Sequence, residues 1–146
     1  MSTNISFRTK PLTEIHVDGD PARVIRLDLA DTGVLTRLKA AEPQLHAIGE
    51  RFASVKGETN AETGEAVAAA MLEAEPQLAA IIDGIFNAKV CAPACGGSSL
   101  FTLDDGMYLF ERIIAVLGGL YSEQMGKEAN QHRERMAKHT AKYGVR

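Results

Sequence analysis

An apolar residue recurs at every third or fourth position through one long stretch of the chain, and this spacing limits the fold more than any other feature. The residues of this stripe are Val34, Leu38, Ala41, Leu45, Ile48, Phe52 and Val55. The stripe predicts a long amphipathic helix over about residues 31–56, with Asp31 as its N-cap. Pro43 lies inside it, and an interior proline removes a backbone hydrogen bond. We therefore expect a kink or a break near Ala40–Glu42.

The same pattern returns further along the chain. AEPQLHAI at residues 41–48 recurs as AEPQLAAI at residues 74–81, displaced by 33. A second helix is therefore predicted over about residues 61–89. An offset of 33 is also the length of some helical repeats. Two units are too few for a repeat array, and the loop at residues 57–60 lacks the turn signatures of such repeats, so we predict an αα-hairpin.

Residues 13–29 show the pattern of a β-hairpin. Apolar and polar residues alternate over residues 25–29, and an Asp-Gly pair, Asp18 and Gly19, separates this run from the one before it. An isolated two-stranded hairpin is only marginally stable in water. The hairpin should therefore pack against the helices that follow.

The stretch VCAPACGGSSLF, residues 90–101, contains both cysteines and is either a metal or redox site or a corner between two helices. Cys91 and Cys95 are separated by three residues, whereas zinc and thioredoxin-like sites use two. We expect Pro93 to stop the second helix and two glycines, Gly96 and Gly97, to supply positive φ angles. The stretch is therefore interpreted as a corner, and neither a metal nor a cofactor is predicted.

A third helix is predicted over about residues 102–125, where Thr102 and Asp105 resemble a capping box. Its apolar stripe thins beyond Gly126. The prediction is a single globular domain at residues 1–126, followed by a charged C-terminal helical extension or tail at residues 127–146. The chain has five Phe, three Tyr and no Trp, a composition that favours helices over a β-sandwich. The predicted fold class is α+β, predominantly helical, with an N-terminal β-hairpin and three long helices.

Charge is spread unevenly along the chain. Six basic and two acidic residues lie in residues 127–146, a balance of +4, whereas the whole chain carries −3. A basic tail on an acidic body is typical either of a segment that contacts an acidic surface or of a solvated helix end. The candidate partner-binding residues are Lys127, Arg133, Arg135, Lys138 and Lys142.

No catalytic pattern emerges from the sequence. His132 and Glu128 share a helix face, but the chain lacks a His-Glu-x-x-His motif, a phosphate-binding loop and a Gly-x-Ser-x-Gly nucleophile motif. No helix-turn-helix pattern accompanies the basic tail, so nucleic-acid binding is not expected. We also find neither a signal peptide nor an uncharged run long enough to span a bilayer. The prediction is a cytoplasmic, non-enzymatic protein with reduced cysteines.

The order of these elements resembles the bacteriophage tail assembly chaperones. The resemblance is carried by Ile15–Asp31, by Ile82-Asp83-Gly84-Ile85-Phe86, and by the passage from Cys95-Gly96-Gly97 to Phe110–Ile114. It covers about residues 13–122. At the turn, this chain has Cys95-Gly96 where the family shows a Phe-Gly pair, and the charged extension after Gly126 has no counterpart in the family.

The resemblance implies protein binding without catalysis. Such chaperones keep the long helical tape measure protein soluble in the host cell cytoplasm until tail tube subunits polymerise around it. The tape measure protein is thus the implied partner, with the major tail protein and further copies of the chain as other partners to consider. Apolar stripes in successive helices either offer a groove to a partner helix or are consumed by the core. The alternatives are a structural tail or neck subunit of the virion, a helical interaction module of unrelated role, and a small helical enzyme.

Overall fold

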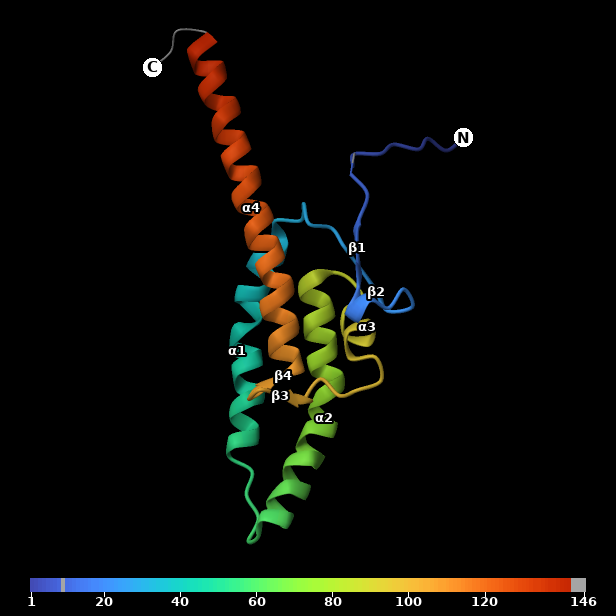
Figure 1. Cartoon of the computed structure of the whole chain (residues 1–146), viewed down its shortest axis with the longest axis vertical. Helices are drawn as coiled ribbons and strands as arrows, with labels where there is room; N and C mark the ends of the chain where they lie inside the picture. The colour runs from blue at the N-terminus through green and yellow to red at the C-terminus, as the bar shows by residue number, and fades with distance from the viewer. Residues whose placement is uncertain (9, 143–146) are drawn as a thin grey trace.

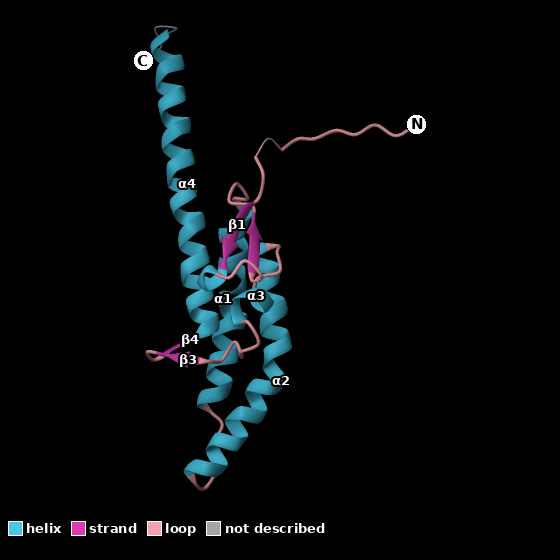
Figure 2. Ribbon diagram, turned by 45° about the vertical axis from the view of Figure 1, so that its right-hand side comes forward, coloured by secondary structure: helices cyan, strands magenta, loops and turns pink. Residues whose placement is uncertain are grey.

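The computed structural model describes residues 1–8 and 10–142, the side chain of Lys142 excepted, and it confirms the predicted mostly helical α+β fold (Figure 1). The elements in chain order are β1 (Thr13–His16), a 3-10 turn (Val17–Gly19), β2 (Val24–Leu27), α1 (Gly33–Ala53), α2 (Asn60–Phe86), α3 (Cys91–Cys95), β3 (Leu103–Asp104), β4 (Met107–Tyr108) and α4 (Leu109–Lys142). The loop between α1 and α2 lies at the opposite end of the molecule from the C-terminal end of α4 (Figures 1 and 2).

The N-terminal hairpin is confirmed. β1 pairs antiparallel with β2, and Ile15 lies opposite Ile25. Asp18 and Gly19 adopt positive φ angles of 53° and 73°, the conformation that an Asp-Gly pair accepts readily. On β2, Ile25 and Leu27 are buried whereas Arg26 is exposed, as the alternating pattern requires. The hairpin thus contributes one apolar face to the core.

The predicted αα-hairpin is also confirmed, since α1 packs along α2. The start of α1 differs from the prediction by one residue. Thr32 is the N-cap and Asp31 precedes it, but the Asp31 carboxylate still accepts a hydrogen bond from the Gly33 N–H at 2.9 Å. At the start of α2, the Thr59 hydroxyl accepts a hydrogen bond from the Glu62 N–H, which satisfies one of the free N–H groups of the first turn.

Neither interior proline breaks its helix, which corrects part of the prediction. Pro43 lies inside the continuous helix α1, and Pro76 lies inside the continuous helix α2. Both prolines are exposed. Their missing N–H groups therefore face the side of the helix where water can satisfy the freed carbonyl. α2 nevertheless changes direction along its length in both views (Figures 1 and 2).

The end of α2 corrects a second prediction, because Pro93 does not stop this helix. α2 ends at Phe86, and Asn87 follows in the left-handed conformation with φ of 50°. Asparagine tolerates this conformation better than most residues, so it ends a helix much as glycine does. Pro93 instead lies in the first turn of the short helix α3, where its missing N–H has no partner to lose.

The third long helix starts later than predicted. Leu103–Asp104 and Met107–Tyr108 pair as a short hairpin, and α4 begins only at Leu109. Asp105 and Gly106 both have positive φ, 53° and 75°, so this second Asp-Gly pair forms a hairpin turn rather than a capping box. From Leu109, α4 continues through Gly126 to Lys142 without interruption. Residues 143–146 of the predicted extension lie outside the described residues.

One core joins the three long helices, β2 and the corner. The largest fully buried side chains come from all of these parts: Leu27, Val34, Leu78, Ile82, Val90, Leu100 and Tyr121. Near the C-terminal end of α1, the ring of Phe101 contacts the ring of Phe52 edge-on, with centroids 5.0 Å apart. The same ring contacts Phe110 with centroids 5.7 Å apart. These aromatic contacts hold the last turns of α1 against the first turn of α4.

Candidate partner-binding surfaces

The cysteine-containing corner is held by partly buried polar contacts. The Asp83 Oδ1 atom accepts hydrogen bonds from the N–H groups of Val90 and Cys91, both at 3.0 Å, and thereby caps the start of α3. The Glu75 Oε1 atom accepts a hydrogen bond from the Leu100 N–H at 2.8 Å. Two carboxylates of α2 therefore fix the chain on both sides of the turn.

The two thiols of this corner are free. Cys91 is buried, and its Sγ donates to the Ala79 carbonyl at 3.7 Å. Desolvation raises the pKa of both thiols, and the charge of Asp83 adds to the effect at Cys91. Among the described residues, no three or more His, Cys, Asp or Glu side chains are grouped to hold a metal ion. The geometry gives these residues a structural role.

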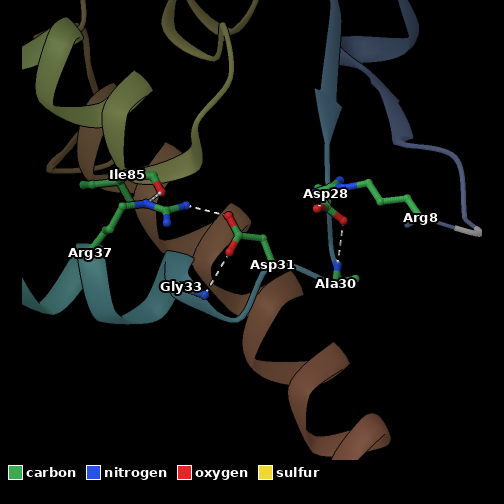
Figure 3. A network of polar contacts seen from close by, with 7 residues as sticks. All are labelled: Arg8, Asp28, Ala30, Asp31, Gly33, Arg37 and Ile85. Atoms are coloured by element: carbon green, nitrogen blue, oxygen red, sulfur yellow. Dashed lines mark hydrogen bonds and ion pairs between the residues drawn. The ribbon is translucent and has the colours of Figure 1, made fainter. Parts of the chain in front are cut away.

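A second polar network fixes the start of α1 against the end of α2 (Figure 3). The Arg37 guanidinium donates to the Asp31 carboxylate at 2.7 Å and to the Ile85 carbonyl at 2.8 Å. The hydrogen bond from Arg37 lowers the pKa of Asp31 against the opposing effect of burial. Arg37 also satisfies a carbonyl in the last turn of α2. The network is therefore part of the scaffold.

The N-terminal arm is residues 1–8 and 10–12 as described. Its beginning projects away from the rest of the molecule (Figures 1 and 2), whereas Phe7, Arg8 and Lys10 lie across a cleft from α4. Arg8 forms an ion pair with Asp28 (Figure 3), and Lys10 lies 3.5 Å from Glu128 of α4. Between the arm, the β2–α1 loop and α4 there is a cleft of about 830 Å³. Its α4 side consists of Gln124, Met125, Glu128, Ala129 and His132. The walls of this cleft carry charges of both signs.

The candidate partner-binding residues all lie on the C-terminal half of α4. We call residues 127–142 the extension. Figure 1 shows it running beyond the rest of the molecule, and every side chain from residue 125 to residue 139 is exposed. Lys127 forms an ion pair with Glu123 at 3.3 Å, and Arg133, Arg135 and Lys138 are exposed. Lys142 is the last residue of α4, and its side chain lies outside the described residues.

An apolar groove runs between α1 and α4 on another part of the surface. It has a volume of about 580 Å³, and we call it the α1/α4 groove. Its lining residues are Leu45, His46, Gly49, Glu50 and Ala53 of α1, and Phe110, Glu111, Ile114 and Ala115 of α4. A Cβ atom at Gly49 would meet no heavy atom within 4 Å, so the groove is open at this point. Leu45, Phe110 and Ile114 form its apolar floor.

Sequence reasoning did not identify this groove. It assigned Leu45 to the first apolar stripe, and it named Phe110 and Glu111 within the segment that carries the resemblance. The sequence feature that relates to the groove is a pair of small residues, Gly49 and Ala53, which lie beside the apolar stripe on the exposed side of α1. That signal cannot identify a groove by itself, because the sequence does not show which helix packs beside α1.

Comparison with family models, with curated proteins and with solved structures finds no match to this chain. Within the described residues, every helix is too short or too polar to cross a membrane.

Proposed function

We propose that this chain is a non-enzymatic phage tail assembly chaperone, which binds a long helical partner, the tape measure protein, and keeps it soluble in the host cytoplasm. The α1/α4 groove is the observation that carries this proposal. A groove with an apolar floor between two helices is the kind of surface that receives the apolar face of an amphipathic helix. The resemblance of the sequence to the tail assembly chaperones suggests the identity of that partner.

The lining of the groove suits a helical partner. Its walls carry the small residues Gly49, Ala53 and Ala115, which allow a partner backbone to approach closely. From Leu45 to Ala53 the α1 wall is about 12 Å long at 1.5 Å per residue, which corresponds to about two turns of a bound helix. A long partner with a repeated apolar stripe could therefore bind one chaperone at each of many places along its length.

The test is co-expression with the tape measure protein encoded in the same genome. The fraction of that protein in the soluble phase should rise when this chain is present. Gly49→Leu should abolish the rise because the new side chain fills the groove, whereas a Cβ at this position meets nothing within the protein. Gly64→Leu on α2 is the matched control, since Gly64 is also exposed and helical with open space around it.

Two results would contradict the proposal. The first is a tape measure protein that stays insoluble beside the wild-type chain. The second is equal solubilisation by wild type and by Gly49→Leu, which would show that any binding occurs elsewhere. Circular dichroism of both leucine variants checks that each one is folded.

A further inference from the structure

The extension is a basic helix that carries one large apolar side chain, Met136. Ala129, His132 and Met136 follow one another at intervals of three and four residues, so they share one face of α4. Met136 is 51% exposed and projects from this face beyond the N-terminal arm cleft. By helical position, Arg133 and Arg135 lie on the two flanks of Met136, and both are exposed. An apolar side chain is therefore presented between two positive charges.

The α1/α4 groove has the opposite charge pattern. Glu50 lies on the α1 wall and Glu111 lies on the α4 wall, and both side chains are exposed. His46 is the remaining titratable residue of the lining, and its Nε2 lies 2.9 Å from the Glu50 carboxylate. Among the described residues that line the groove, none is a lysine or an arginine. An apolar floor is thus bordered by a negative charge on each side.

The extension cannot reach the groove of its own chain. Both surfaces belong to α4, which is one continuous helix of 34 residues. At 1.5 Å per residue, Met136 lies about 30 Å along the helix axis from Ala115 at the groove. Only the groove of another copy can therefore receive the extension.

We propose that the extension of one copy binds in the α1/α4 groove of a second copy. Met136 contacts the apolar floor, and Arg133 and Arg135 lie beside the two carboxylates of the rim. The contact is heterologous, since the two copies use different surfaces, and repetition produces chains or rings rather than a closed pair. Self-association does not depend on the tape measure protein. If both proposals hold, a partner helix and a neighbouring extension compete for one groove.

The test is sedimentation velocity on the purified full chain over a range of concentrations, with no partner present. The wild-type average mass should rise with concentration at low salt and fall on addition of salt, because exposed charges are screened over about 8–10 Å at physiological ionic strength. Gly49→Leu should abolish the rise. Reversal of the groove by Glu50→Lys with Glu111→Lys should also abolish it, as should reversal of the extension by Arg133→Glu with Arg135→Glu.

Mixing the two reversed variants provides a test of the specific pairing. In each variant alone, the groove and the extension carry charges of the same sign. In the mixture, the groove of either variant meets an extension of opposite sign on the other variant, so the average mass should rise again. The controls are Gly64→Leu and the double variant Lys56→Glu with Lys89→Glu, which changes the net charge as the extension reversal does. Both control variants should associate like wild type, and circular dichroism checks that all the variants are folded.

Three outcomes would overturn the proposal: a wild-type protein that stays monomeric at low salt, association that survives both Gly49→Leu and the reversals, or a mixture that stays monomeric. The tape measure proposal fails separately, through the solubility of the tape measure protein. A chain that does not self-associate can still solubilise that partner, and a chain that self-associates can fail to do so.

Discussion

The guanidinium group of Arg23 lies directly against the backbone of Gly96, so that a Cβ atom at Gly96 would be 2.6 Å from the Arg23 Cζ atom. Arg23 donates hydrogen bonds to the carbonyls of Pro93 at 2.9 Å and Ala94 at 2.8 Å. One arginine from the N-terminal hairpin therefore satisfies the end of α3, about 70 residues further along the chain.

Gly96→Ala should destabilise the protein for two reasons. The new methyl group would displace Arg23, and Gly96 has a φ of 55°, which costs an alanine about 1–2 kcal/mol. We expect the free energy of unfolding, measured by urea denaturation, to fall by about 1–3 kcal/mol. Gly84→Ala inside α2, where a Cβ meets nothing within 4 Å, is the control and should leave stability unchanged or raise it. Equal loss in both variants would contradict this account.

Tyr121→Phe should preserve stability at neutral pH or raise it by up to about 1 kcal/mol. Tyr121 is 1% exposed, and its hydroxyl has no hydrogen-bond partner among the described residues. Burial, aided by the charges of Asp31 and Asp28, raises the pKa of the phenol to about 12. Since the unfolded phenol ionises near pH 10, the wild-type free energy of unfolding should fall between about pH 10 and 12. Tyr121→Phe should not show this fall above pH 10. A clear loss of stability in the variant at pH 7 would contradict the account, because it would indicate that the hydroxyl has a hydrogen-bond partner.

Asp31→Asn should flatten the decrease in stability at acid pH. The folded pKa of Asp31 is lowered by Arg37. The contribution of Asp31 to the free energy of unfolding is therefore present above the unfolded pKa of about 4 and is lost as pH falls through the folded pKa.

Arg37→Lys should lower the free energy of unfolding at pH 7 by about 0.5–1.5 kcal/mol, because an ammonium group cannot replace the two-sided contact with Asp31 and Ile85. Thermal unfolding between about pH 2 and 7 measures both effects. Identical pH profiles for Asp31→Asn and wild type would contradict the assignment.

Replacing both Cys91 and Cys95 with alanine should leave the fold intact at a cost of about 1 kcal/mol for the lost buried sulfur. Because burial raises the pKa of both thiols, they should react slowly with a disulfide reagent in the folded protein and rapidly in denaturant. Elemental analysis should show no difference in bound metal between wild type and the double variant. Metal lost from the variant alone would contradict the structural role.

Truncation after Gly126 should change the melting temperature by less than about 4 °C. The removed side chains are exposed up to residue 139, and the Lys10–Glu128 ion pair that is lost joins two exposed groups. A large fall in melting temperature would instead show that Ala129 and Met136 pack against the body.

The local pattern of the chain predicted most of the secondary structure. The apolar stripe that begins at Val34 predicted α1, and the recurrence of its pattern at residues 74–81 predicted α2, each to within a few residues. A 3–4 apolar spacing can be buried along one face only by a helix. The first Asp-Gly pair predicted the β1–β2 hairpin. The second pair, Asp105 and Gly106, carried the same signal, but Thr102 and Asp105 also fit a capping box. These few adjacent residues could not decide between a hairpin turn and a capping box.

The sequence by itself determined the three long helices, which of their faces are apolar, and that VCAPACGGSSLF turns the chain. Only the tertiary structure decided which helices lie together, and therefore where the α1/α4 groove is and that Glu50 and Glu111 lie on its two walls. It also decided that Arg23 of the hairpin satisfies the end of α3. The physical reason is that helical periodicity acts within about four residues, whereas a groove or a distant carbonyl contact depends on how whole elements pack around one core.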